Sequence, residues 1–127
     1  MQRQRTGRIG EELACAHLAA LGWRLVERNA RTRFGEIDIV AADGSSLVFV
    51  EVKTLRAGGA RGPEGPLAAI GPRKRLQVRR LARAWLAERP RPAGPGGRFE
   101  VIRFDAIGIT IGPGERLLDL EHVPGAF

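Results

Sequence analysis

The chain has 127 residues, of which 43% are hydrophobic and 28% charged, and its formal net charge is +7. This length suits one domain over residues 1–127, because a single hydrophobic core typically serves roughly 100 to 150 residues, and the composition excludes global disorder. The excess of basic residues favours a polyanionic partner, above all nucleic acid, through long-range attraction and counterion release. A coding bias toward arginine, with many cations merely solvated, is the alternative explanation.

The few cysteine and histidine residues argue against a thiol or histidine metal centre. Cys15 is the only cysteine, which excludes an intramolecular disulfide and predicts a role in helix packing. His17 and His122 are isolated in the sequence and are expected at the surface or in packing roles. No stretch approaches the roughly 18 consecutive apolar residues of a spanning helix, and no apolar segment follows the basic residues 1–8 as in a signal peptide. We therefore expect a cytoplasmic protein without membrane association.

The first predicted elements are a helix and an edge strand. Apolar residues recur at near-helical spacing over residues 9–21, and Gly22 then supplies a stop of the C-cap type. Residues 23–27 alternate between apolar and charged side chains, which predicts a short strand closed by the turn-prone Asn29. We expect this strand at an edge of the sheet.

A β-hairpin follows. Residues 35–41 (GEIDIVA) are typical of a strand, and Asp43 with Gly44 is a hairpin signal before residues 47–53 (LVFVEVK). The second strand begins apolar on both faces, which predicts a central position covered on two sides. Residues 56–71 are rich in Gly, Pro and Ala and are predicted to form a loop of the kind that often orders on a ligand.

The last third of the chain adds a helix and strands. Pro72 suits the first turn of a helix over residues 72–88, and a second Pro/Gly-rich loop follows at 89–97. Residues 99–111 predict one long strand or two joined strands, and 116–123 a last apolar and charged segment. The order α, β, β, β, α, β, β predicts an α/β protein with a mixed sheet flanked by helices. The buried side of the helix is predicted from Leu76, Leu81, Trp85 and Leu86, with Trp85 in the core rather than stacked on a base.

Four ionic side chains lie on the predicted hairpin. Alternate residues of a strand share a face, so Glu36 should project with Asp38, and Glu51 with Lys53. Two carboxylates on adjacent strands give a hard cation such as Mg²⁺ a minimal oxygen platform, with positions left for water and phosphate. An ammonium beside them could orient the water or offset charge on the phosphate. This chemistry predicts phosphodiester hydrolysis at Asp38, Glu51 and Lys53.

A plain alternative is that Glu51 and Lys53 form a solvated ion pair, which is common and adds little stability. Three observations weigh against it: the earlier Asp38, the apolar strand that leads into the pair, and the scarcity of lysine. Only Lys53 and Lys74 are lysines among 21 basic residues, and arginine cannot replace a compact, rotatable ammonium. We therefore favour a functional site.

These motifs resemble those of the YraN-like family of small bacterial proteins, which is similar to archaeal Holliday junction resolvases and to restriction-endonuclease-like nucleases. The matching segments are Gly10 and Glu11 on the first helix, GEID at 35–38 and VEVK at 50–53, and the resemblance covers nearly the whole chain. It implies a three-layer, restriction-endonuclease-like (Holliday-junction-resolvase-like) domain over residues 1–127. It also implies a catalytic set of Asp38, Glu51, Lys53 and Glu11, with Asp38, Glu51 and Glu11 around Mg²⁺ or Mn²⁺. Glu12 is expected in solvent, and Glu36 outside the minimal metal site.

The expected function is that of a Mg²⁺- or Mn²⁺-dependent endodeoxyribonuclease or a related DNA-processing protein. Branched DNA as substrate and a homodimer are implied by the resemblance alone. The alternative, from another class, is a noncatalytic nucleic-acid-binding or scaffold protein that keeps the nuclease fold. The basic residues predicted to contact the nucleic-acid backbone are Lys74, Arg73, Arg75, Arg31, Arg33 and Arg56.

Overall fold

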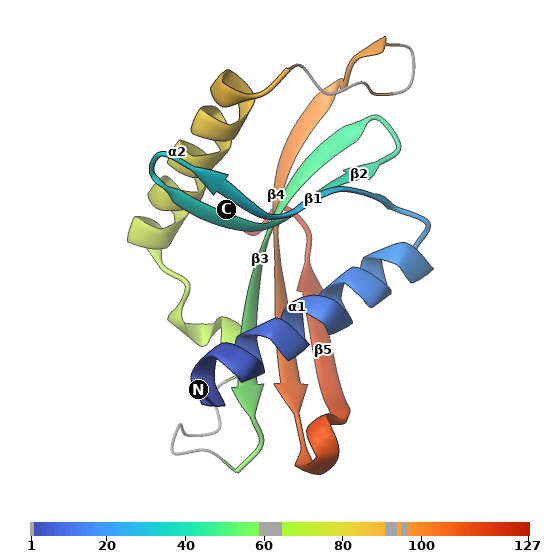
Figure 1. The fold of residues 1–127 in the computed structure, drawn as a ribbon, viewed down its shortest axis with the longest axis vertical. Coiled ribbons are helices and arrows are strands. Elements are labelled where there is room, and N and C mark those ends of the chain that lie inside the picture. Colours follow the sequence, from blue (N-terminus) through green and yellow to red (C-terminus); the bar gives the residue numbers. More distant parts are fainter. Residues whose placement is uncertain (1, 59–64, 91–93, 95–96) are drawn as a thin grey trace.

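The structure is a computed structural model that describes residues 2–58, 65–90, 94 and 97–127 (Figure 1). Its order of helices and strands is the predicted one, with two short 3-10 helices, η1 and η3, added to it. The elements are α1 (Gln2–Ala20), β1 (Arg24–Thr32), β2 (Gly35–Asp43), β3 (Ser46–Arg56), η1 (Pro66–Ala69), α2 (Pro72–Glu88), β4 (Val101–Ile111), η3 (Pro113–Glu115) and β5 (Leu117–Val123).

The five strands form one mixed sheet in the order β1-β2-β3-β4-β5. Neighbouring strands are antiparallel except β3 and β4, which run parallel because α2 lies between them in the chain and returns it to the same end of the sheet. Helix α1 crosses in front of the strands in Figure 1, and α2 packs on the opposite face. The expected α/β fold, with three layers around a central mixed sheet, is confirmed.

Each face of the sheet has its own core, and β3 contributes to both. Val48 and Val50 pack under α1, whereas Leu47 and Phe49 pack under α2. This confirms the prediction of a central strand covered on two sides. Cys15 is buried in the core under α1, as predicted.

Helix α1 ends where the sequence predicts but begins earlier. Gly22 has φ +86°, and the N–H groups of Gly22 and Trp23 donate to the carbonyls of Ala19 and Leu18, each at 3.0 Å, as in a Schellman motif. The predicted start at residue 9 is wrong, since the helix already begins at Gln2. Residues 2–8 carry little apolar pattern, but Gln and Arg are strong helix formers.

Strand β1 is an edge strand, as predicted, but longer than residues 23–27. The expected turn at Asn29 is wrong: this residue adopts φ +50° and the strand continues to Thr32. Asparagine tolerates the left-handed region better than most residues, so one such residue does not end the pairing. A register shift between Leu25 and Glu27 also belongs to this irregular strand.

Helix α2 has the predicted bounds, but one face assignment fails. Leu81 and Trp85 are buried as predicted, whereas Leu76 is 71% exposed. The buried face also includes Val78, and Leu76 stands two positions before it, about 200° around the helix. Residues 99–111 contain one strand, β4, and of the predicted loop at 56–71 the part 59–64 lies outside the described residues. No helix among the described residues is long and apolar enough to span a membrane.

Candidate metal and nucleic-acid site

The site is centred where β2 and β3 separate. Their antiparallel pairing ends at Ile39 and Val50. Just beyond that pair, the backbone N–H of Val52 donates to Oδ2 of Asp38 at 2.8 Å. A side-chain carboxylate thus accepts a bond that a strand carbonyl would accept in a continued ladder. This hydrogen bond holds the Asp38 carboxylate in a fixed orientation beside β3.

Glu51 lies beside this opening and has two lysine partners. Its side chain is 10% exposed, and its Oε1 lies 3.0 Å from Nζ of Lys74 and 3.5 Å from Nζ of Lys53. Glu51 shares the face of β3 with Leu47 and Phe49, which α2 covers. Lys74 therefore reaches Glu51 from the first turn of α2. Two ammonium groups offset the cost of burying this carboxylate.

Burial and the neighbouring carboxylates raise the pKa of Asp38. Burial first, and then the charge of Glu51, raise the pKa of Asp38 from its ordinary 3.8 to about 7, against the opposing effect of the Val52 N–H bond. Glu11 raises this pKa further, and the charge of Lys74 lowers it. Burial and the two neighbouring carboxylates therefore disfavour the charged form of Asp38 more than Lys74 favours it. A divalent cation bound beside Asp38 would favour that charged form.

Glu11 reaches this region because α1 packs very closely on β3. A Cβ added to Gly10 would lie 1.7 Å from Oγ1 of Thr54, so only glycine permits this approach. Burial, and then the charges of Glu36 and Glu51, raise the pKa of Glu11. Glu12 is exposed, as predicted.

The donor set fits a Mg²⁺ or Mn²⁺ ion that keeps several waters. Such ions are bound by one or two carboxylates together with water and substrate phosphate, and Asp38 with Glu51 supply that number. Among the described residues, no group of three or more His, Cys, Asp or Glu side chains is gathered closely enough to hold a metal. Glu11 therefore stands near the pair without completing a ligand cage.

Glu36 does not join Asp38 as strict strand alternation predicts. Its side chain is 45% exposed, and it pairs with Nη2 of Arg31 across the β1–β2 ladder at 3.6 Å. Alternation breaks down near this point, because Ile37 packs in the core under α2 while Ile39, two residues later, packs in the core under α1. This change of face between the two isoleucines breaks the regular alternation on which the prediction for Glu36 rested.

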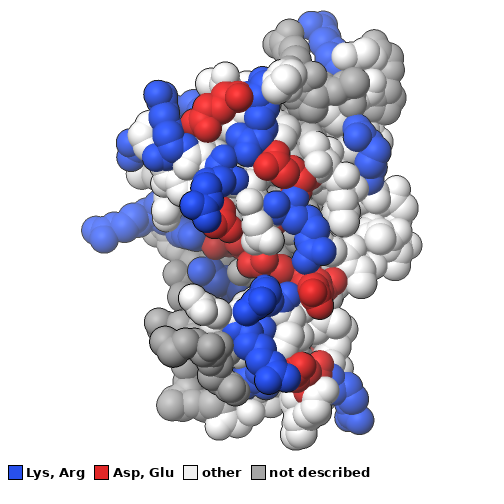
Figure 2. Space-filling view, viewed as in Figure 1, with Lys and Arg blue, Asp and Glu red and all other residues white. Residues whose placement is uncertain are grey.

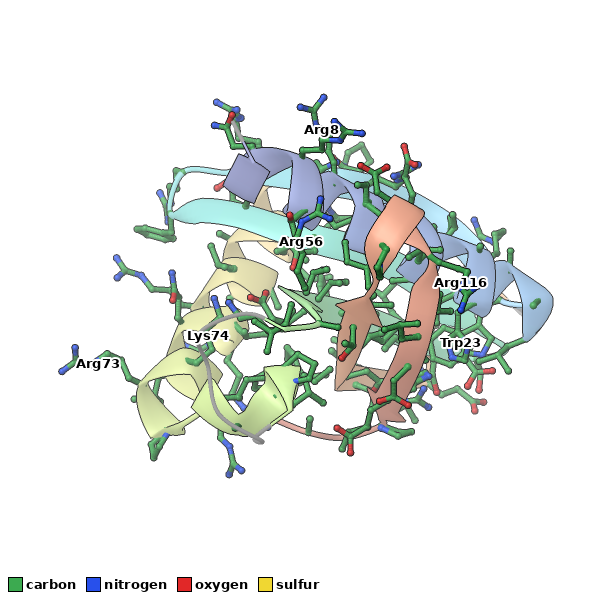
Figure 3. All side chains as sticks on the ribbon, turned by 90° about the horizontal axis from the view of Figure 1, so that it is seen from below. Arg8, Trp23, Arg56, Arg73, Lys74 and Arg116 are labelled. Carbon is green, nitrogen blue, oxygen red and sulfur yellow. The ribbon has the colours of Figure 1, made fainter. Side chains whose placement is uncertain are left out.

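The predicted basic contacts fall into two groups. Figure 2 shows Lys and Arg side chains interleaved with Asp and Glu side chains in a band across one face of the molecule. Arg73 and Arg75 are exposed at the start of α2, and Figure 3 shows Arg73 projecting away from the helix while Lys74 lies on the side of the sheet. Arg31 and Arg33 are exposed on the β1–β2 hairpin. These four arginines can meet a phosphate backbone.

Arg56 and Lys74 have partners within the protein. Nε of Arg56 donates to Oγ1 of Thr6 at 2.9 Å, and its Nη2 lies 3.9 Å from Glu115. Arg56 thus links the start of α1 to the segment before β5. Lys74 was expected to contact nucleic acid, and the structure adds its ion pair with Glu51 at the centre of the site.

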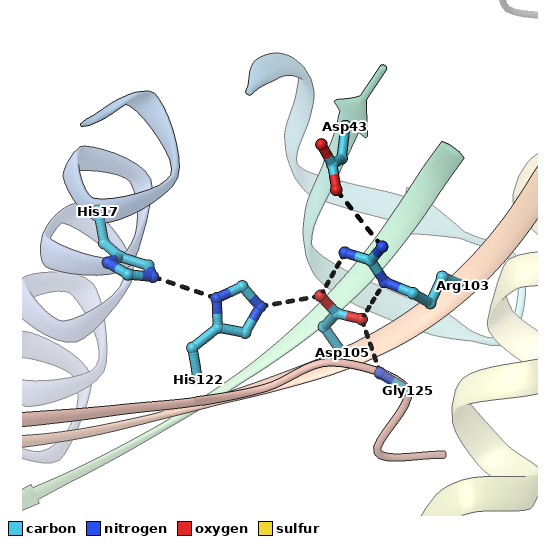
Figure 4. Close-up of polar contacts among 6 residues, drawn as sticks. All are labelled: His17, Asp43, Arg103, Asp105, His122 and Gly125. Atoms are coloured by element: carbon cyan, nitrogen blue, oxygen red, sulfur yellow. Dashed lines mark hydrogen bonds and ion pairs between the residues drawn. The ribbon is translucent and has the colours of Figure 1, made fainter. Parts of the chain in front are cut away.

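A second polar cluster, which the sequence did not predict, lies near the other end of α1 (Figure 4). His122 Nε2 lies 2.8 Å from Oδ2 of the fully buried Asp105, and His122 Nδ1 lies 3.1 Å from His17 Nε2. Because a carboxylate only accepts, His122 donates from Nε2. In the neutral ring, Nδ1 of His122 then accepts from His17. The packing roles predicted for both histidines hold, but they are not isolated from each other.

Asp105 is held in its charged form by this cluster. Burial alone would raise its pKa, but hydrogen bonds from Arg103, His122 and the Gly125 N–H lower it. Arg103 also lies 3.4 Å from Asp43. The cluster therefore joins α1 to β4, β5 and the β2–β3 turn, away from Asp38. Its one signal in the sequence is an aspartate inside the apolar strand β4.

A mixed sheet between two helical layers, with two carboxylates and two lysines where its strands separate, defines a small α/β protein of three-layer, nuclease-like fold. The chain belongs to the YraN-like family whose model is described as "Uncharacterised protein family UPF0102", which matches residues 10–109. The matched segment contains Glu11, Asp38, Glu51, Lys53 and Lys74.

Similar proteins carry the same family name. The chain is 46% identical over 125 residues to a UPF0102 protein of Anaeromyxobacter dehalogenans, covering 98% of this chain and 85% of that protein. It is 50% identical over 105 residues to one of Streptomyces griseus, covering 83% and 82% of the two chains. It is 44% identical over 127 residues to one of Moorella thermoacetica, covering 100% and 98%. The family resemblance inferred from the motifs is confirmed.

Proposed function

We propose that this protein is a metal-dependent endonuclease that hydrolyses phosphodiester bonds in DNA. The observation that carries the proposal is the opening between β2 and β3, where Asp38 and Glu51 meet two lysine ammonium groups. Carboxylates for a hard cation and ammonium groups for a phosphate are the elements that this reaction needs. The exposed arginines around them would hold the DNA backbone.

Asp38 and Glu51 would hold Mg²⁺ or Mn²⁺, with Glu11 acting from nearby. When bound, such an ion polarises a phosphoryl oxygen and lowers the pKa of a bound water. The Val52 N–H fixes the orientation of the Asp38 carboxylate, and the ion pair with Lys74 fixes that of Glu51. Both carboxylates are thus preorganised by neighbours on β3 and α2.

The two lysines would have different roles. Lys53 is the more exposed of the pair, with 40% of its side chain accessible, and its contact with Glu51 is the longer one. Its ammonium is therefore free to turn toward a phosphate and donate to the oxygens on which charge develops in the transition state. Lys74 is more enclosed and would remain the partner of Glu51. A homodimer acting on branched DNA is the form of this activity that the family resemblance suggests.

Cleavage of labelled single-stranded, duplex, flap and four-way-junction DNA in Mg²⁺ or Mn²⁺ tests the proposal. Asp38→Asn and Lys53→Ala should each lower the rate by roughly 100-fold or more, because they remove transition-state stabilisation. Glu12→Gln, next to Glu11 but exposed, is the matched control and should cut like the native protein. Cleavage by the Asp38→Asn variant at the native rate would refute the proposal. The absence of metal-dependent cleavage of every substrate would refute it as well.

One observation favours a second candidate, a noncatalytic DNA-binding protein. Glu51 already has two lysine partners, so its charge is largely balanced without a metal. Titration calorimetry with Mg²⁺ and Mn²⁺ separates the candidates. The nuclease should bind the metal and lose this binding in Asp38→Asn, whereas a scaffold should bind DNA with no metal uptake in either form.

A further inference from the structure

The turn that joins β1 to β2 presents an exposed aromatic ring. Phe34 is 40% exposed, whereas every other Phe and Trp of the described chain is buried or half-buried. Two guanidinium groups lie against this ring, with Cζ of Arg80 3.8 Å and Cζ of Arg33 4.8 Å from the ring centroid. An exposed aromatic ring beside arginines is a combination that nucleic-acid-binding proteins use to hold bases.

The turn is held firmly in place. The N–H of Phe34 donates to Oγ1 of Thr32 at 3.1 Å, and that hydroxyl donates to the carbonyl of Gly35 at 2.8 Å. Gly35 has φ +136° and packs against Leu81 of α2, where a Cβ would lie 3.3 Å from that side chain. Figure 1 shows the turn reaching α2. The ring is therefore presented on a fixed support, which lowers the entropy cost of stacking a ligand on it.

The ring lies within reach of the proposed metal site along two elements. Phe34 precedes Asp38 by four positions on the β1–β2 hairpin, about 13 Å of extended strand. That is roughly four nucleotide steps of a stacked DNA strand. On α2, Lys74 contacts Glu51 and Arg80 covers the ring. One DNA strand can therefore meet both places at once.

We propose that Phe34 is the stacking platform for an unpaired nucleobase of the DNA strand that enters the site. This inference rests on the proposed function and specifies its substrate: DNA in which unpaired nucleotides adjoin the bond to be cut. Duplex bases already stack on one another and do not offer a face to a protein ring, whereas an unpaired base does.

The two arginines beside the ring would have different roles when DNA binds. Arg80 stays on the ring from α2, because its contact is the closer one. Arg33, with 72% of its side chain exposed and only a 3.9 Å pairing with Glu88, leaves the ring for the incoming base and contacts the adjoining phosphate. The exposed Arg31 adds positive charge to the same hairpin. Removing the ring should therefore weaken binding of unpaired DNA selectively.

The test uses the full chain in EDTA, where a metal-dependent nuclease cannot cut, and DNA that carries 2-aminopurine either paired in a duplex or unpaired beside one. Anisotropy gives the affinity, and quenching of 2-aminopurine reports stacking. Phe34→Leu keeps an apolar side chain against α2 but removes the aromatic face. It should weaken binding of unpaired DNA by about tenfold, abolish quenching and leave duplex binding unchanged.

Two further variants serve as controls. Phe34→Trp should keep the quenching and the preference for unpaired DNA. Leu21→Ala removes another exposed apolar side chain, 52% exposed, which precedes the end of β1 opposite the β1–β2 turn, and should behave like the native protein. If Phe34→Leu lowers the melting temperature, the test rests on Phe34→Trp, which keeps an aromatic ring. Loss of 2-aminopurine quenching in Phe34→Trp would overturn the proposal.

The outcomes separate this inference from the proposed function. The inference would be overturned if Phe34→Leu bound unpaired DNA as the native protein does, or lost affinity equally for duplex and unpaired DNA. The ring would then serve only to pack the hairpin against α2. Selective, ring-dependent binding without cleavage in Mg²⁺ or Mn²⁺ would support the inference while refuting the nuclease. If Phe34→Leu cleaves DNA as the native protein does, the result would support the nuclease and refute the stacking role of Phe34. If the protein binds no DNA at all, the result would refute both the nuclease and the stacking role.

Discussion

The carboxylate of Asp38 lies in a place that costs the protein stability. It is largely buried, it faces Glu51, and these two effects together raise its pKa to about 7. Natural proteins accept such costs at functional sites, where charge must be concentrated before a ligand arrives. Lys74 and the Val52 N–H reduce the cost without removing it.

Asp38→Asn should stabilise the metal-free protein above neutral pH. The folded-state pKa of about 7 exceeds the ordinary 3.8, so the folded protein holds this proton longer and the native protein loses stability as pH rises from about 4 to 7. At pH 8 the variant should gain about 1 to 3 kcal/mol in free energy of unfolding, less than the full shift implies because the site is partly solvated. Urea denaturation in EDTA at pH 4 and pH 8 measures it.

The control for this prediction is Asp119→Asn, an exposed aspartate of β5, which should change little at either pH. A variant that is less stable than the native protein at pH 8 would show that the hydrogen bond from Val52 outweighs the crowding of charge. Excess Mg²⁺ should reverse the order of the two proteins, because only the native site binds it.

At the scale of the elements, the contact between α1 and β3 determines where Glu11 stands. Gly10 lies directly against Thr54, and the strand that carries Thr54 also carries Glu51 and Lys53. The helix and the strand therefore cannot shift independently. The closeness of this contact depends on the absence of one methyl group.

Gly10→Ala should push α1 away from β3 and destabilise the fold by roughly 1 to 3 kcal/mol, as overpacking does. Gly7→Ala, on the same helix with nothing within 4 Å of the added Cβ, is the matched control. It should be neutral or slightly stabilising because alanine favours helices. Thermal unfolding compares them, and equal melting temperatures would contradict the tight contact. Gly10→Ala combined with Thr54→Ala should recover part of the loss.

Local patterns predicted the elements that carry Asp38 and Glu51. The hairpin of β2 and β3 follows from alternation and from the Asp43-Gly44 signal, and α2 from its proline and apolar spacing. Failures arose where a local rule was overridden. Asn29 adopts a turn-like φ inside a paired strand. Leu76 faces solvent because a different face of α2 packs against the sheet. Neither choice is visible without the tertiary partner.

At the scale of the whole molecule, contacts between distant parts of the chain were beyond the reach of the sequence. Lys74 reaches Glu51 only because α2 returns across the sheet between two parallel strands. His17 and His122 stand 105 positions apart and meet through the packing of α1 beside β5. Sequence spacing gives no measure of such distances.

The histidine cluster should make the whole fold sensitive to mild acid. Burial, and then His122, lower the pKa of His17, so the unfolded chain takes up a proton there more readily than the folded protein does. The contribution of His17 to stability should therefore be complete above the ordinary value of 6.5 and be lost as pH drops below it. His17→Gln should flatten this dependence. Denaturation midpoints between pH 5 and pH 8 test it, and parallel curves for the two proteins would contradict it.

The positive charge of the molecule should appear as a salt dependence of DNA binding. Each phosphate neutralised contributes a slope of about −0.9 to the logarithm of affinity against the logarithm of salt concentration. The double variant Arg73→Ala, Arg75→Ala neutralises fewer phosphates, so its slope should be less negative by up to about 2. Arg116→Ala, on the far side of the molecule from Lys74 in Figure 3, is the control. Equal slopes in all three proteins would remove these arginines from the interface.

The raised pKa of Asp38 has a consequence for the thermodynamics of metal uptake. At neutral pH a substantial fraction of the metal-free molecules hold a proton on that carboxyl group. Any ion that binds there must displace the proton into the buffer, so protons and metal compete for one position. Metal affinity should consequently strengthen as the solution becomes more alkaline. The heat of binding should also change with the ionisation enthalpy of the buffer chosen.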